Sequence, residues 1–143
     1  MAKLNNPSNG TPSIICLLDS DVVINWLAKE EDPNTHKELW EAPHKIMKSI
    51  EEGRIRGFST LINLLEIRFV LRRKKSISED KIKEDIAKIL KLLEIVVPDE
   101  VNLLKANSLQ SENPFSPFDA MLIAIVLSID GVTLITRDKS LLQ

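Results

Sequence analysis

The sequence predicts an α/β fold, namely a three-layer α/β/α sandwich with a central parallel sheet. Short apolar runs of strand length alternate with longer helical patterns, in the order β-α-α-β-α-α-β-α-α-β. No internal repeat or interior linker divides the chain, and its 143 residues correspond to one domain of ordinary size. We therefore expect residues 1–13 to form a flexible leader and residues 14–143 to form a single domain.

Four short apolar segments are expected to form the sheet. The first, residues 14–18, is a continuous apolar run, which is typical of a strand covered on both faces. Glycine or proline residues border the others, which are residues 55–59, 95–97 and 132–136.

Amphipathic patterns between these segments predict the helices. Apolar residues recur at helical spacing from Ile82 to Leu93 with Lys and Glu on the other face, and Ser76 and Glu79 offer a capping box. Asp99 is expected to cap the next helix. The remaining helices are expected over residues 33–52, kinked or divided at Pro43, and over residues 60–73 and 117–130.

Composition excludes several classes of protein. The formal net charge is -2, so a nucleic-acid partner would have to be held by a local basic patch or through metal ions. The single cysteine, Cys16, excludes an internal disulfide and favours a reducing compartment. No segment reaches the roughly 20 apolar residues that cross a bilayer. We therefore expect a cytoplasmic protein with no membrane partner.

Acidic residues occur at four places where the predicted elements meet. Asp19 and Asp138 directly follow two strands, and Asp119 lies in the first turn of an apolar helix. Glu66 shares its helix face with Ile62 and other apolar residues, so we expect that face to be buried. Because parallel strands bring their carboxyl ends to one edge of the sheet, we expect the four carboxylates to share a pocket.

Each acid also has a structural interpretation. Asp19 and Asp138 are suited to capping the helices that follow them, and Asp119 fits a capping box led by Ser116. A buried Glu66 would require a cationic partner. The candidate partners are Arg68, Arg72 and Arg137.

A pocket with four carboxylates favours a divalent cation, because like charges repel each other at short range. Ligation by carboxylates alone selects the hard ions Mg²⁺ or Mn²⁺ over zinc. His36 and His44 lie in a charged segment and are expected to be solvated, while Cys16 is expected in the core. The sequence therefore predicts a magnesium or manganese site.

Four motifs, in this order, resemble those of PIN-domain nucleases. The motifs are Asp19-Ser20-Asp21-Val22-Val23-Ile24, Glu66 in its Leu-rich helix, Phe118-Asp119-Ala120-Met121-Leu122-Ile123-Ala124 and Leu134-Ile135-Thr136-Arg137-Asp138. The similarity covers about residues 14–142, and single-domain members of this length are mostly VapC-type toxins. The leader departs from the family pattern, as does the short stretch of five residues after Asp138.

The resemblance implies an endoribonuclease that binds one or two Mg²⁺ or Mn²⁺ ions and hydrolyses phosphodiester bonds with metal-activated water. The catalytic residues and metal ligands that it implies are Asp19, Glu66, Asp119 and Asp138. Ser20 and Thr136 match hydroxyl positions that orient water or a carboxylate, and Asp21 matches a position that is often a structural cap. The implied partners are single-stranded or structured RNA, a cognate antitoxin and a second copy in a homodimer.

Cationic residues near the predicted pocket are candidates for holding RNA. They are Arg72, Arg73, Lys74, Lys75 and Arg137. The first four are equally consistent with a solvated helix end, where positive charge suits the helix dipole.

Two other functions remain open. Asp19-Ser20-Asp21-Val22 also resembles the first motif of haloacid-dehalogenase-type phosphatases, in which the first Asp is a nucleophile and the second a general acid. That family needs a Gly-Asp signature late in the chain, and no such signature occurs before Asp138 in this sequence. The second alternative is a PIN fold that serves as a non-catalytic RNA- or protein-binding module.

Overall fold

The computed structural model describes residues 14–29, 34, 38–138 and 141, and its elements follow the predicted order. They are β1 (Ile14–Leu18), α1 (Ser20–Ala28), α2 (Glu41–Glu51), β2 (Ile55–Thr60), α3 (Leu61–Arg73), α4 (Glu79–Leu92), β3 (Glu94–Val96), α5 (Glu100–Glu112), α6 (Pro117–Ser128) and β4 (Val132–Ile135). The predicted fold class is confirmed, whereas the leader expected over residues 1–13 lies outside the described residues.

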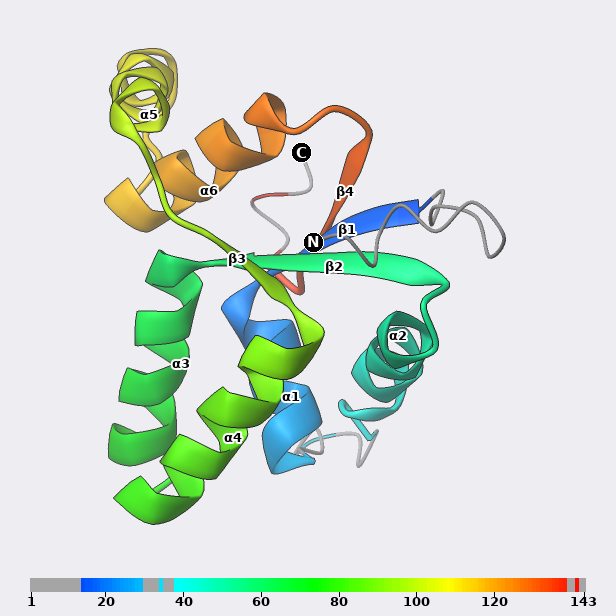
Figure 1. Ribbon diagram of the computed structural model, residues 1–143. Coiled ribbons are helices and arrows are strands. Elements are labelled where there is room, and N and C mark those ends of the chain that lie inside the picture. The colour runs from blue at the N-terminus through cyan, green and yellow to red at the C-terminus, as the bar shows by residue number, and fades with distance from the viewer. Residues whose placement is uncertain (1–13, 30–33, 35–37, 139–140, 142–143) are drawn as a thin grey trace.

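The sheet has four parallel strands in the order β3-β2-β1-β4 (Figure 1). The chain moves outward from β1 to β3 and then crosses back to the other side of β1. Because parallel crossovers are right-handed, this reversal places α1–α4 on one face of the sheet and α5 and α6 on the other. Ligands of open α/β sheets bind where the strand order reverses, at the carboxyl ends of the strands.

The two faces of β1 pack into two different hydrophobic cores. Cys16 and Leu18 contact the core beneath α1–α4, and Leu17 contacts the core beneath α5 and α6. All three side chains are buried, as the continuous apolar run predicted. The expectation that Cys16 lies in the core is also confirmed.

Two helix starts differ from the sequence-based expectation. Among the described residues, α2 begins at Glu41, so Pro43 lies in its first turn, where a backbone N–H has no partner within the helix. The N-cap of α4 is Ser78 rather than Ser76. Ser76 instead adopts a left-handed conformation with φ of 53° between α3 and α4.

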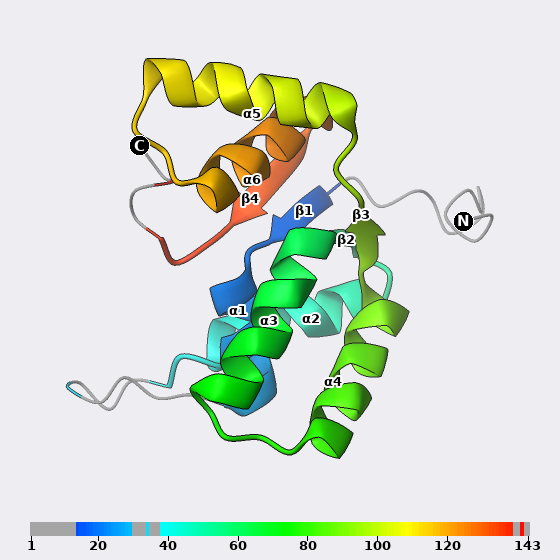
Figure 2. The ribbon, with the colours of Figure 1, turned by 90° about the vertical axis from the view of Figure 1, so that its left-hand side faces the viewer.

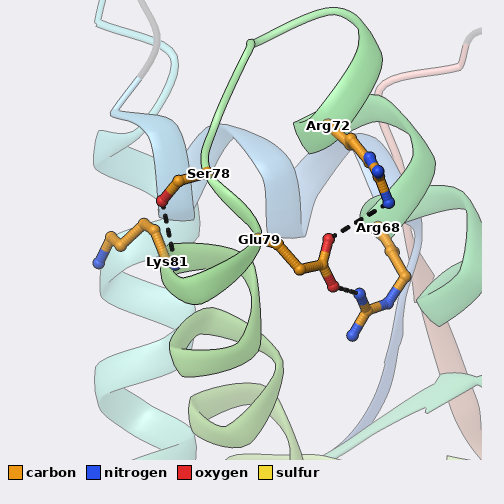
Figure 3. Close-up of polar contacts among 5 residues, drawn as sticks. All are labelled: Arg68, Arg72, Ser78, Glu79 and Lys81. Atoms are coloured by element: carbon orange, nitrogen blue, oxygen red, sulfur yellow. Dashed lines mark hydrogen bonds and ion pairs between the residues drawn. The ribbon is translucent and has the colours of Figure 1, made fainter.

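Ion pairs connect α3 to the start of α4 (Figure 3). The Glu79 carboxylate contacts Arg68 and lies 3.5 Å from Nη1 of Arg72. Both arginines had been considered as partners of Glu66, and both instead pair with α4.

None of the described helices is long and apolar enough to cross a bilayer.

Candidate metal and nucleic-acid site

A pocket of about 240 Å³ lies at the carboxyl edge of the sheet, and all four predicted acids line it. Asp19 and Asp138 follow β1 and β4, which pair with each other, while Glu66 lies on α3 and Asp119 in the first turn of α6. Figure 2 shows α3 leading away from the sheet on one side and α6 crossing the other side. The other lining residues are Asp21, Thr60, Ile62, Asn63, Phe118 and Leu122.

The Asp19 carboxylate is held by three donors from different parts of the chain. Its Oδ1 accepts from the backbone N of Ser20 at 2.8 Å and from Nδ2 of Asn63 at 3.1 Å. Its Oδ2 accepts from Oγ1 of Thr136 at 2.7 Å. Asp19 is therefore the N-cap of α1 and also part of the pocket wall, so its structural and functional interpretations coexist.

Asn63 is a residue of this site that sequence reasoning missed. Its side chain is buried, and besides Asp19 its Nδ2 donates to Oγ of Ser20 at 2.8 Å. Its Oδ1 accepts from Oγ1 of Thr60 at 2.7 Å. The available signal was a lone amide in an apolar helix, one turn before Glu66. The amide connects the ends of β1 and β2 through these contacts.

Asp21 was assigned as a cap, but Asp19 has that role, and Asp21 lies two positions later in the first turn of α1, where it lines the pocket. Its Oδ2 accepts from the backbone N of Arg137 at 3.2 Å, and its buried Oδ1 has no hydrogen-bond partner among the described residues. Burial, followed by repulsion from Asp19, raises the pKa of Asp21 to about 6. The pocket thus disfavours negative charge at this position.

Asp119 has the cap contact that the sequence predicted, because Oγ of Ser116 accepts from its backbone N at 3.2 Å. Burial raises the pKa of the Asp119 carboxyl, and repulsion from Asp138 and Asp19 acts in the same direction against the hydrogen bond with Ser116. The Asp119 carboxyl is therefore close enough to Asp138 and Asp19 for their negative charge to act on it.

The expectation that Glu66 lies on a buried face is wrong. The buried positions of α3 are Asn63, Ile67 and Leu71, whereas Glu66 is exposed at the rim of the pocket. Phe69, one turn further along α3, is also exposed, so this side of the helix faces away from the core. Glu66 therefore needs no buried cationic partner.

The residues of the pocket suit a divalent cation in chemical type. They supply carboxylate oxygens and hydroxyl groups, and two of the acids have a raised pKa that positive charge would lower. Within the described part of the chain, no three His, Cys, Asp or Glu side chains already form a set of metal ligands.

Lys74 and Lys75 line a second pocket of about 300 Å³ beside the acidic one. The two pockets share Asp21 and Glu66 as lining residues, so the lysine-lined pocket lies next to the acidic one. An extended polyanion could contact both pockets at once.

The other predicted RNA-binding residues are engaged elsewhere. Arg72 pairs with α4, and the Arg73 guanidinium lies 5.9 Å from the ring centroid of Phe69. The backbone N of Arg137 donates to Asp21 in the pocket, whereas its guanidinium donates to the carbonyl of Leu39. Of the five predicted RNA-binding residues, two lysines therefore line the pocket beside the acids, and three arginines make contacts elsewhere.

Together, the fold and the site define a three-layer α/β/α protein with an acidic pocket at the switch point of a parallel sheet. Comparison with family models matches the PIN domain over residues 16–143. The chain belongs to the PIN domain family, and PIN domains are typically Mg²⁺-dependent nucleases. A comparison with curated proteins finds no match.

Proposed function

We propose that this protein is a metal-dependent endoribonuclease. The observation that carries the proposal is that Asp19, Glu66, Asp119 and Asp138 line one pocket although they lie far apart in the sequence. These four residues would hold one or two Mg²⁺ or Mn²⁺ ions. When bound, such an ion lowers the pKa of water and neutralises charge on a scissile phosphate.

The residues around Asp19 prepare the site for this role. The three hydrogen bonds from Ser20, Asn63 and Thr136 hold its carboxylate in one orientation. A ligand that is already oriented loses less conformational entropy when an ion binds. We assign Ser20 and Thr136 a supporting role. Thr136 donates to the Asp19 carboxylate through its hydroxyl, and Ser20 donates through its backbone N.

The surroundings of the pocket suit a polymer that extends beyond it. The neighbouring pocket shares Asp21 and Glu66 with the acidic one and is lined by two lysines. An RNA strand that crosses the pocket needs only one phosphate at the carboxylates. The ammonium groups of Lys74 and Lys75 would then contact phosphates further along the backbone.

Cleavage of single-stranded RNA tests this proposal. Wild type should cleave with Mg²⁺ but not with EDTA, leaving 5′-phosphate and 3′-hydroxyl ends, and Asp19→Asn should be inactive while retaining its fold. Asp130→Asn is the matched control, because Asp130 is exposed and lies outside the pocket. Cleavage that survives both EDTA and Asp19→Asn would contradict the assignment.

We further propose that the protein is the cytoplasmic toxin of a toxin–antitoxin pair and forms a homodimer. The similarity to VapC-type toxins supports this role, and an acidic pocket is suited to an arginine supplied by an antitoxin. Induced expression in a bacterium should arrest growth, and Asp19→Asn should relieve the arrest. Normal growth with full-level expression of wild type would contradict the toxin role, and light scattering tests the dimer.

One observation favours a phosphatase as the second candidate. A pKa of about 6 would suit Asp21 as the general acid beside a nucleophilic Asp19. Membership of the PIN family favours the nuclease instead. Trapping of a phosphoaspartate on Asp19 would support the phosphatase. A non-catalytic module would bind RNA or protein without taking up metal in titration calorimetry.

A further inference from the structure

One wall of the acidic pocket is apolar, and its most prominent member is Phe118. This side chain is 61% exposed although it lines the pocket, and Ile62 and Leu122 line the pocket with it. Phe118 is the second residue of α6, after Pro117, and directly precedes Asp119. An aromatic ring therefore lies immediately beside the proposed metal ligands.

Core packing does not explain the position of Phe118. The residues of α6 that pack into the core lie further along the helix. They include Ala120, Met121 and Leu122, which are all buried. None of the ring–ring or cation–ring contacts recorded among the described residues involves Phe118. Its face is available to a ligand that enters the pocket.

We propose that Phe118 is a stacking platform for an unpaired nucleobase. The inference rests on the proposed nuclease function, since it places the RNA backbone across the carboxylates. Bases stack on aromatic rings with little sequence preference, and only an unpaired base exposes its face to such a ring. The neighbouring lysine-lined pocket favours a polyanion over an apolar peptide as the occupant. A base on Phe118 and phosphates near Lys74 would span the acidic pocket from both sides.

Fluorescence anisotropy with a short labelled single-stranded RNA tests this subsite. We would use Glu66→Gln as the background with Mg²⁺, so that the RNA is not cut during the titration. Phe118→Ala should weaken binding by about 5- to 150-fold, which corresponds to about 1–3 kcal/mol per stacked base. Phe118→Trp should retain the affinity and Phe118→Leu should not, because stacking needs a ring and not only apolar area.

Leu127→Ala provides the matched control. Leu127 lies on the same helix, is 59% exposed and does not line the pocket, so its truncation should leave RNA affinity unchanged. A fully paired duplex of the same sequence should bind equally well to Phe118→Ala and to its background. Circular dichroism should show the same melting temperature for both truncations.

The outcomes separate this inference from the nuclease proposal. Equal RNA affinity of Phe118→Ala and Leu127→Ala would overturn the stacking platform, even if wild type cleaves RNA. If Phe118→Leu bound RNA as tightly as the Glu66→Gln background with Phe118 intact, the stacking platform would also be overturned. A third outcome is that RNA binding depends on an aromatic residue at position 118 but wild type does not cleave RNA with Mg²⁺. This outcome would support the stacking platform and overturn the nuclease proposal.

Discussion

The Thr136 hydroxyl donates to Oδ2 of Asp19 at 2.7 Å, across 117 positions of the sequence. The contact exists because β4 returns beside β1 at the point where the strand order reverses. Asp19 follows the end of β1 and Thr136 follows the end of β4, so the two side chains meet at the edge of the sheet. This relationship makes Thr136 a positioning residue for the proposed metal site.

We predict that Thr136→Val weakens Mn²⁺ binding by about 10- to 100-fold, as loss of a contact to a metal ligand typically does. Isothermal titration calorimetry measures the effect, and Thr136→Ser should restore most of the affinity because it keeps the hydroxyl. Thr133→Val is the control, since Thr133 lies exposed on the same strand. Equal affinities of the two valine variants would contradict the positioning role.

We predict that Asn63→Leu destabilises the protein by about 1–3 kcal/mol, because it leaves buried polar groups of Thr60 and Ser20 without their amide partner. Urea unfolding followed by circular dichroism measures the change in the free energy of unfolding. Asn107→Leu on α5 is the control, because this amide is exposed. A change no larger than that of the control would show that the buried network contributes little to stability.

The environment of Asn63 illustrates what could be predicted from the sequence. Periodicity and strand-length runs predicted the order of the ten elements because those signals are local. The meeting of the four acids followed from the parallel topology, which brings strand ends together. The partners of Asn63 depend instead on how α3 is rotated about its own axis. No local pattern reports that rotation.

The same rotation explains the error at Glu66. Apolar residues occur all round α3, so their periodicity does not identify the face that packs into the core. In the structure Leu65 and Phe69 remain exposed, and Asn63, a polar residue, is buried. The raised pKa of Asp21 was equally invisible in the sequence, because it arises from burial and from the proximity of Asp19.

We predict that the stability of the metal-free protein falls as pH rises from about 4 to 6, through the contribution of Asp21. The pKa of Asp21 is about 6 in the fold and 3.8 for an unperturbed aspartate, so the folded state binds more protons than the unfolded state in this window. Asp21→Asn should therefore raise the melting temperature at pH 7 more than at pH 4. Asp130→Asn is the control for loss of a carboxylate at an exposed position. An Asp21→Asn effect that is independent of pH would contradict the raised pKa.

We predict that Mg²⁺ stabilises the protein more at pH 7.5 than at pH 5. Protons compete with the ion, because burial raises the pKa values of both Asp21 and Asp119. An ion at about 100 times its Kd adds about 2.7 kcal/mol, which for a domain of this size raises the melting temperature by about 5–10 °C. Thermal denaturation with NaCl at equal ionic strength provides the control. A Mg²⁺ effect equal to that of NaCl would argue against a specific site.

Finally, we predict that Lys74 and Arg72 contribute differently to RNA binding although they are two positions apart. Lys74 lines the pocket beside the acids, whereas Arg72 lies 3.5 Å from Glu79 and joins α3 to α4. Lys74→Gln should weaken binding and reduce the slope of log affinity against log salt concentration by about 0.7, the value for one phosphate contact in single strands. Arg72→Gln should leave that slope unchanged and cost at most about 1 kcal/mol of stability, as an exposed ion pair does. RNA titrations of the Glu66→Gln background at several salt concentrations measure both slopes. If Arg72→Gln reduced the slope as much as Lys74→Gln, the whole helix end rather than the lysine-lined pocket would hold the RNA.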